Sequence, residues 1–319
     1  MDEFQLIRKY FSKLSKNNKS ALNLNDDVFF DKSKKLVISV DTYVEGTHFL
    51  NFEKPELVIK KIIRSSISDL ICKGVKPKFY FISGSGNKKS FSSNNLRRIA
   101  KSLKQEQKKY NISLCGGDTV FSDKLSFTII SFGFSNKIIL RNNVKLNDDI
   151  YVTGNLGDSF VGLNILKKRF NLNQKLNKYF ILKYYMPNLH LKLIDDLFFF
   201  ANSSIDISDG LVSDLEKLIN KQKFSYKLDL ASIPVSENLK KLISLKGLNK
   251  KNFISQGDDY QILFTANSTK SRIIKKISNS LGIKISKIGK ICSHLDNNEI
   301  IDQKGMKISL KNKGYIHKF

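Results

Sequence analysis

Short acidic clusters beside Gly, Ser or Thr are the residues of this chain best suited to chemistry. They recur along its length as Asp26-Asp27, Asp41-Thr42, Ser68-Asp69, Gly116-Gly117-Asp118-Thr119, Asp206-Ile207-Ser208-Asp209-Gly210 and Gly257-Asp258-Asp259-Tyr260. Crowded, partly desolvated carboxylates cost free energy unless cations neutralise them. Oxygen-only clusters suit a hard cation such as Mg²⁺, usually shared with phosphates. The pattern therefore predicts a Mg²⁺-nucleotide enzyme.

The composition is that of a globular protein with one large or two ordinary domains. The chain has 319 residues, of which 41% are hydrophobic and 26% charged. No run approaches the roughly 18 apolar residues of a membrane span, and the acidic, amphipathic start is unlike a secretory leader. The widely spaced Cys72, Cys115 and Cys292 favour neither a disulfide framework nor a zinc site. These features predict a cytoplasmic protein without a membrane partner.

The net charge of +26, from 55 Lys and Arg against 29 Asp and Glu, raises a second possibility. A basic excess can mark a nucleic-acid-binding protein. Here the lysines are spread from end to end, and no aromatic-interleaved basic motif stands out. We expect a solvated surface that helps to attract anionic substrates. A non-catalytic nucleic-acid-binding protein remains the alternative of a different class, but it leaves the ordered acids unexplained.

Alternating strand and helix patterns predict an α/β (α+β) first half. The apolar run 36–40 predicts a strand that ends at Asp41. Helical spacing over 55–72, begun by Pro55, places Asp69 at the polar edge of a helix. Further predicted elements are a helix over 93–110, a strand over 112–114, a Gly-Gly-Asp-Thr turn over 116–119 and a strand over 125–134.

The polar stretch 141–148 predicts a junction between an N-terminal domain, 1–140, and a C-terminal α/β domain, 145–319. The second domain's predicted elements are strands over 149–153, 261–266 and 287–291 and helices over 157–170 and 210–220.

Several motifs admit a structural role beside the functional one. Ser208 or Asp209 could cap the helix that follows them, although capping explains one residue and not two acids plus a serine. A helix start also attracts phosphate. The Gly-rich turn 153–158 is equally consistent with a helix cap or an anion cradle. His48, seven residues after Asp41, is equally consistent with a substrate contact or a structural histidine.

Taken together, these pieces resemble the thiamine-monophosphate kinase family, whose superfamily includes aminoimidazole ribonucleotide synthetase and selenophosphate synthetase. The most discriminating string is Asp41-Thr42-Tyr43-Val44-Glu45-Gly46-Thr47-His48-Phe49, and the resemblance extends over nearly the whole chain to Tyr315. It implies a two-domain, aminoimidazole ribonucleotide synthetase-like fold. In that fold an N-terminal sheet domain binds ATP and metal and dimerises, and a C-terminal α/β domain completes the active site.

The resemblance implies ATP-dependent phosphorylation of thiamine monophosphate to thiamine diphosphate, by direct in-line transfer, in a homodimer with several Mg²⁺ ions. By matching position, the implied metal residues are Asp26, Ser39, Val40, Asp41, Asp69, Asp118, Asp206 and Asp209. The implied ATP contacts are Gly117, Asp118, Arg141 and Ser208, and the implied substrate contacts are His48, Asp258 and Tyr315. The implied catalytic residues are Asp118, Arg141 and Asp209.

Three residues depart from the family pattern. Asn25 stands where Gly is usual, and Val40 stands where a hydroxyl residue is frequent, so only its backbone carbonyl could bind a metal. Asp258 replaces a frequent Glu and has a shorter reach. Another ATP-dependent synthetase of the superfamily, with a different acceptor, remains an alternative. A selenophosphate synthetase is disfavoured because no cysteine precedes Asp26.

Overall fold

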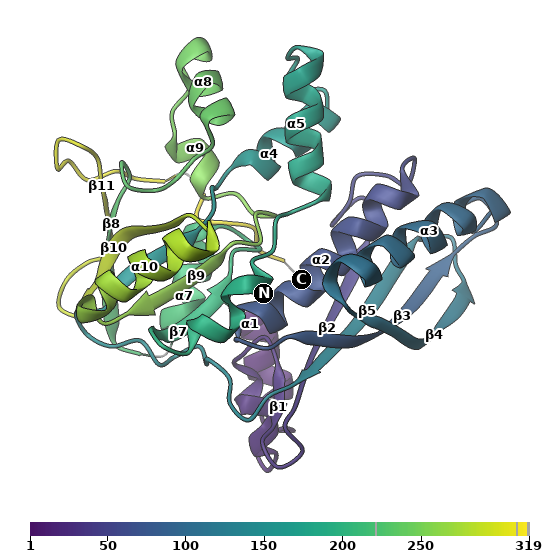
Figure 1. The fold of residues 1–319 in the computed structure, drawn as a ribbon, viewed down its shortest axis with the longest axis horizontal. Coiled ribbons are helices and arrows are strands. Elements are labelled where there is room, and N and C mark those ends of the chain that lie inside the picture. The colour runs from purple at the N-terminus through teal and green to yellow at the C-terminus, as the bar shows by residue number, and fades with distance from the viewer. Residues whose placement is uncertain (221, 311, 318–319) are drawn as a thin grey trace.

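The computed structural model describes residues 1–220, 222–310 and 312–317. The first half of the chain forms one sheet and the second half another, and the two lie side by side (Figure 1). This α/β fold with two sheets confirms the predicted fold class.

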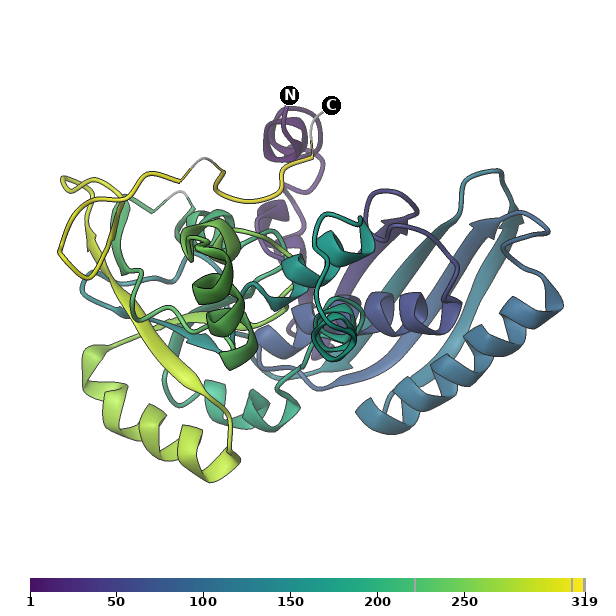
Figure 2. The same ribbon diagram turned by 90° about the horizontal axis from the view of Figure 1, so that it is seen from above.

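The first sheet has five strands among the described residues, in the order β1-β2-β5-β3-β4. Their bounds are β1 Phe29–Asp31, β2 Leu36–Val44, β3 Pro77–Gly86, β4 Ser113–Phe121 and β5 Ser126–Phe134. Only β3 and β4 pair in parallel. Helices α2 (Pro55–Cys72) and α3 (Ser93–Tyr110) lie on one face of this sheet (Figure 2).

The second sheet has six strands in the described residues, in the order β11-β8-β10-β6-β9-β7. Their bounds are β6 Asp149–Thr153, β7 Ala201–Asp206, β8 Phe224–Asp229, β9 Ile262–Ala266, β10 Ile285–Ser293 and β11 Glu299–Ile301. The helices of this half are α4 Asp158–Leu166, α5 Gln174–Tyr185, α6 Ile194–Leu197, α7 Leu211–Ile219, α8 Glu237–Lys246, α9 Lys251–Ile254 and α10 Ser271–Leu281. Short 3₁₀ turns cover Leu191–Leu193 and Ser268–Lys270.

The N-terminal segment begins with α1 (Glu3–Leu6), continues as a π-helical turn over Ile7–Phe11 and includes a 3₁₀ stretch over Lys19–Leu24. Residues 315–317 lie beside the N-terminal helix α1 (Figure 2). In the described part of the chain, no helix is long and apolar enough to cross a membrane. The cytoplasmic location stays a prediction.

Helix α2 has the predicted bounds, with Pro55 in its first turn. Most of its apolar side chains, among them Ile59 and Ile63, are buried. Two of its polar residues, Lys61 and Ser68, reach acids of the second half, and α2 contacts β7. One continuous hydrophobic cluster joins residues of both halves, from Tyr43 to Phe264. The two halves therefore pack on a shared core, and the division into domains 1–140 and 145–319 stays a prediction.

Two predicted elements were wrong. Residues 116–119 form the middle of β4 and not a turn, because they pair with β3, a strand that the sequence analysis missed. Gly117 lies so close to β3 that an added Cβ would stand 1.7 Å from the carbonyl oxygen of Ile82. Gly117 therefore serves close strand packing. The helix predicted over 157–170 ends at Leu166.

Candidate active site

Three acids from three elements approach one another where α2 packs between the two sheets. Asp41 lies on β2, Asp69 near the end of α2, and Asp206 at the end of β7. The Ser39 hydroxyl donates a hydrogen bond of 2.5 Å to Oδ2 of Asp69. The Ser68 hydroxyl donates a short hydrogen bond to Oδ2 of Asp206. Consecutive residues of α2 thereby link β2 and β7, and the charges of Asp41 and Asp206 both act on Asp69, so the three acids form one acidic cluster.

Burial controls the charge of this cluster. It raises the pKa of Asp41 to about 7 and that of Asp206 to about 6. Burial also raises the pKa of Asp69 well above its usual range, and the neighbouring charges of Asp41 and Asp206 raise it further. Such carboxylates favour protons or cations as partners. The cluster is therefore suited to binding a cation.

The carboxylates of the acidic cluster suit Mg²⁺ that is bound partly by protein and partly by water and phosphate. They do not suit a metal ion that is enclosed by protein side chains. In the described part of the chain, no three His, Cys, Asp or Glu side chains are arranged to enclose a metal ion. Mg²⁺ is usually bound by one or two carboxylates, with waters and substrate phosphates completing its shell. The oxygen-only cluster is consistent with that pattern. The side chain of Val40 is exposed while its neighbours Ser39 and Asp41 are more buried, so only the Val40 carbonyl remains a candidate ligand.

Asp26 belongs to an adjacent group of ion pairs. The ammonium of Lys73, which is fully buried, lies 2.8 Å from Asp26 and 3.0 Å from Asp27. Burial alone would lower the pKa of Lys73, but the charges of Asp26, Cys72 and Asp69 and the hydrogen bond to Asp26 together outweigh that effect and raise it. The Arg141 amide donates to Asp26 at 2.9 Å, and its guanidinium pairs with Asp27. Arg141 is thus held beside a predicted metal residue.

The segment before α7 does not cap the helix through its side chains. Asp214, inside the helix, accepts hydrogen bonds of 3.0 Å from the amides of Asp209 and Gly210. The cap residue, Gly210, makes no side-chain bond, so the capping alternative for Ser208 and Asp209 is wrong. The Asp209 carboxylate instead lies 2.5 Å from the Lys217 ammonium. The side chains of Ser208 and Asp209 therefore do not cap α7.

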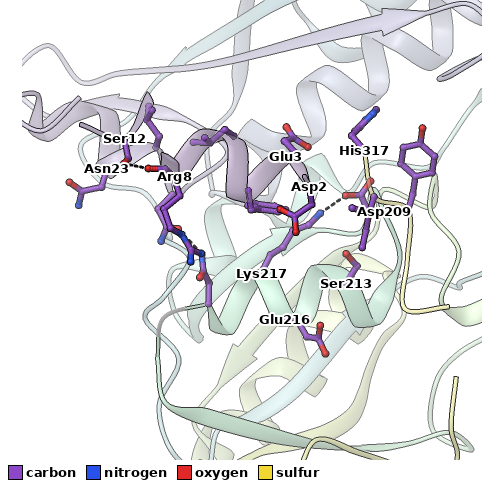
Figure 3. Close-up of a pocket in the computed structure, with 17 residues that line it drawn as sticks. Asp2, Glu3, Arg8, Ser12, Asn23, Asp209, Ser213, Glu216, Lys217 and His317 are labelled. Carbon is purple, nitrogen blue, oxygen red and sulfur yellow. Dashed lines mark hydrogen bonds and ion pairs between the residues drawn. The ribbon is translucent and has the colours of Figure 1, made fainter. Parts of the chain in front are cut away.

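A pocket of about 250 Å³ lies beside Asp209 (Figure 3). Its walls come from α1, α7 and the C-terminal residues 315–317. Charged groups from Glu3, Asp209 and Lys217 line it together with the rings of Phe4 and Tyr315. The pocket combines apolar and polar walls, as a site for an organic phosphate would.

Two of the predicted substrate contacts, His48 and Asp258, lie near Lys61 of α2, and Tyr315 approaches them through His317. The Nδ1 atom of His48 accepts a hydrogen bond of 3.0 Å from the Val44 amide, so neutral His48 carries its proton on Nε2. Burial, together with the charges of His317 and Lys61, lowers the pKa of His48 and keeps it neutral at pH 7. The His317 ring lies 5.5 Å from the His48 ring and 4.9 Å from the Tyr315 ring.

Asp258 completes this region. Its carboxylate lies 2.7 Å from the Lys61 ammonium, and its amide donates a 2.8 Å hydrogen bond to the Ser208 carbonyl. That backbone bond connects a predicted substrate residue to a predicted ATP residue. Asp258 and Tyr260 both have positive φ, 69° and 49°, a conformation that costs L residues energy and concentrates at functional sites.

Gly117 and Asp118 are not brought to the acidic cluster within this chain. Both lie on β4, an edge strand whose residues are exposed throughout. Two strands, β5 and β3, separate β4 from β2, which carries Asp41. Asp118 is therefore a surface acid of the single chain.

The turn over 153–158 is closed by an internal contact. Asp259 accepts a 2.8 Å hydrogen bond from the Gly157 amide, and burial raises the pKa of Asp259 well above its usual range. The amide that could have faced an anion is thus already bound, which disfavours the anion-cradle alternative.

Sequence reasoning missed the lysines of the site. The even spread of lysines predicts a solvated basic surface. Three of them are instead at least partly buried against an acid: Lys61, Lys73 and Lys217. A usable signal exists for Lys61, since Lys61, Ser65, Ser68 and Asp69 have helical spacing on α2 and so lie on one side of the helix.

Comparison with known proteins identifies the family to which the chain belongs. Residues 24–135 match the family described as AIR synthase related protein, N-terminal domain. The chain is 34% identical to the thiamine-monophosphate kinase of Buchnera aphidicola subsp. Acyrthosiphon pisum, over 99% of this chain and 98% of that protein. It is 30% identical to the thiamine-monophosphate kinase of Escherichia coli (strain K12), again over 99% of this chain and 98% of the relative. Among solved structures, AaThiL complexed with AMPPCP and TMP matches with a TM-score of 0.84 and 26% identity, covering 99% of this chain and 97% of that one. The chain belongs to the thiamine-monophosphate kinase family.

Proposed function

We propose that the protein transfers the γ-phosphate of ATP to the phosphate of thiamine monophosphate, giving ADP and thiamine diphosphate. The observation that carries this proposal is the buried acidic cluster of Asp41, Asp69 and Asp206 between the two sheets. The similar AaThiL structure is complexed with AMPPCP, an ATP analogue, and TMP. Family membership favours this enzyme over a nucleic-acid-binding protein.

The chemistry requires little beyond positioning and charge screening. Two unit charges 4 Å apart repel by about 4 kcal/mol at an effective dielectric constant of 20, and the reacting phosphates carry several charges. The acceptor phosphate has a second pKa of about 6, so at neutral pH it is already deprotonated and needs no general base. An acceptor oxygen bonds to Pγ as the bond from Pγ to the β,γ-bridging oxygen breaks, with no phosphoenzyme.

We further propose that Mg²⁺ is held by the carboxylates of Asp41, Asp69 and Asp206, with Ser39 and Ser68 orienting two of them. When bound, the ions screen the phosphate charges and polarise the transferred group. Asp26 and Asp209 adjoin this cluster, and each is paired with a lysine here. Arg141 supplies a cation beside Asp26.

A homodimer is proposed from the open face of the first sheet. The face opposite α2 exposes a row of apolar side chains across neighbouring strands, in which Val40 pairs with Ile130 and Ile130 with Phe81. The rings of Phe79, Phe132 and Phe134 adjoin this row, with centroids 5.4–6.4 Å apart. Large exposed apolar patches mark interaction surfaces. A second copy seated on this face would also bury the β4 edge that bears Gly117 and Asp118.

The proposed reaction can be tested directly. Purified protein is incubated with Mg-ATP and thiamine monophosphate, and thiamine diphosphate and ADP are assayed. We expect equal amounts of both products, and their loss on adding EDTA or on Asp118→Asn. ATP turnover only with a different phosphate or carbonyl acceptor would favour another synthetase of the superfamily. A folded protein that neither binds ATP nor forms product would overturn the proposal.

A further inference from the structure

Lys61 is a buried cation in a position that the reaction chemistry does not explain. Only 1% of its side chain is exposed, although lysine is among the residues least often buried. Its ammonium lies 2.7 Å from Oδ1 of Asp258 and 3.6 Å from the centroid of the Tyr184 ring. Among the described residues, no acceptor meets this ammonium in good hydrogen-bonding geometry. The ion pair and the ring are therefore the contacts that compensate its burial.

The two oxygens of Asp258 have different surroundings. Oδ1 lies next to Lys61 and also accepts a hydrogen bond of 3.2 Å from the Tyr260 hydroxyl. No residue in the described ranges donates a hydrogen bond to Oδ2, and 28% of the side chain is exposed. One oxygen is thus held while the other can accept from a ligand.

The backbone around Asp258 is also fixed. The amides of Asp258 and Tyr260 donate hydrogen bonds of 2.8 Å to the carbonyls of Ser208 and Ile207. Because the backbone is held in a left-handed conformation, the side-chain torsions of Asp258 are its remaining freedom. Lys61 and the Tyr260 hydroxyl restrict those torsions.

The position of this pair along α2 indicates which part of the acceptor it meets. Eight residues separate Lys61 from Asp69, or about 12 Å of helix at 1.5 Å per residue. Asp69 belongs to the acidic cluster, whereas Lys61 and Asp258 lie near His48. The pair therefore lies beside His48, about two turns of α2 from Asp69. A carboxylate oxygen there accepts hydrogen bonds and repels phosphate oxygens, so it suits the organic part of the acceptor.

We infer that Lys61 is a positioning residue for the acceptor, because it holds Oδ1 of Asp258 and so directs Oδ2 toward an N–H or cationic group in the organic part of the acceptor. This inference rests on the proposed function. Lys61 acts through Asp258 and does not itself touch the acceptor. It also compensates for the shorter reach of Asp258, since an unheld carboxylate would lose its fixed direction.

The test compares steady-state kinetics of Lys61→Met, Lys61→Arg, Asp258→Asn and the double variant Lys61→Met/Asp258→Asn with wild type. Lys60→Met, a less buried neighbour on the same helix, is the matched control. We expect Lys61→Met to raise the KM for thiamine monophosphate roughly 10- to 100-fold, with kcat and the KM for ATP within about threefold, as loss of one partner of a buried pair implies. Lys61→Arg should recover most of that loss.

The double variant separates positioning from general destabilisation. Since Lys61 acts only through Asp258, the double variant should equal Asp258→Asn alone. It also removes both charges, so it stays informative where Lys61→Met alone fails to fold. The inference is overturned by an acceptor KM in Lys61→Met equal to that of Lys60→Met, or by a further loss when Lys61→Met is added to Asp258→Asn.

Calorimetric binding of thiamine monophosphate without ATP keeps this test separate from the proposed reaction. Weaker binding by Lys61→Met supports the inference even where product formation is not observed. Wild type that binds but makes no thiamine diphosphate overturns the proposed function alone.

Discussion

The hydroxyl of Ser68 on α2 donates a hydrogen bond to the carboxylate of Asp206 at the end of β7, across 138 residues of sequence. The next residue, Asp69, accepts a hydrogen bond from Ser39 on β2. One segment of α2 thus bonds to β7 of the second sheet through Ser68 and to β2 of the first sheet through Asp69. The proposed metal cluster therefore depends on how the two halves pack.

Removing the Ser68 hydroxyl should impair the cluster without removing an acid. Burial raises the pKa of Asp206, and the hydrogen bond from Ser68 opposes that rise. Ser68→Ala should therefore raise the pKa further and lower turnover roughly 10-fold, as loss of a hydrogen bond to a charged group implies. In the pH dependence of kcat, the acidic limb should move to higher pH. Ser102→Ala, at a buried serine on α3, is the control. If the pH dependence of kcat is the same in Ser68→Ala as in wild type, Ser68 does not control the protonation of Asp206.

Neutralising Asp69 should cost far more activity than stability. Asp69→Asn should lower kcat by roughly 10²–10³ or more, because the group stabilises charge in the transition state. Without Mg²⁺ the variant should unfold at a higher temperature than wild type, since a buried acid with a raised pKa is replaced by a neutral amide. Asp123→Asn, at an exposed acid, should change neither property. Turnover near wild type in folded Asp69→Asn would exclude the residue from the site.

Asp118→Asn should lower turnover by a similar factor of roughly 10²–10³ while leaving the thermal unfolding of the single chain unchanged. The reason is its exposed position on the β4 edge, where the native fold does not depend on the carboxylate. Stopped-flow turnover and calorimetric unfolding of the same preparation measure both. Full activity would mean that the β4 edge does not contribute to the site.

Without Mg²⁺ the stability of the folded protein should fall as pH rises, and Mg²⁺ should oppose that fall. The folded pKa values of Asp41, about 7, and Asp206, about 6, lie above the ordinary value of about 3.9 for Asp. The folded protein then binds more protons than the unfolded chain, so this contribution to stability is complete below about pH 4 and is lost as pH rises to about 7. Mg²⁺ competes with these protons and should raise the unfolding temperature more at pH 8 than at pH 5. Asp41→Asn should weaken this dependence, and equal stabilisation at both pH values in wild type would contradict it.

A charge on the open sheet face should dissociate the proposed dimer. Phe81→Asp places a carboxylate in the apolar row, next to Ile130, whereas Leu245→Asp places one on α8, where Leu245 is already 82% exposed. Sedimentation velocity should show monomers for Phe81→Asp and dimers for wild type and Leu245→Asp. A wild-type monomer at all concentrations would refute the dimer.

His48→Ala should act on the acceptor and spare ATP. His48 is neutral with its proton on Nε2, so it can donate one hydrogen bond to the acceptor. We expect a roughly 10-fold rise in the KM for thiamine monophosphate and an unchanged KM for ATP. His294→Ala, in the turn after β10, is the control. An acceptor KM equal to wild type would count against the contact.

The sequence by itself determined the elements whose signals are local. Helical periodicity and Pro55 predicted α2 residue for residue, and the polar edge of that helix carries Asp69 as expected. The spacing of acids beside Gly, Ser and Thr identified the residues of the acidic cluster. Such features are encoded within a few residues of each other, so no knowledge of distant contacts is needed.

Only the tertiary structure decided which charges are buried and which glycines lie in strands. Gly116-Gly117 became part of β4 because β3, more than 30 residues earlier in the chain, pairs with it. Lys61 and Lys73 are buried because Asp258 and Asp26 reach them from other elements. Burying an ammonium is favourable only with its partner in place, and that partner is brought by packing of the two halves. The residues that neighbour a lysine in sequence do not predict which distant acid will pair with it.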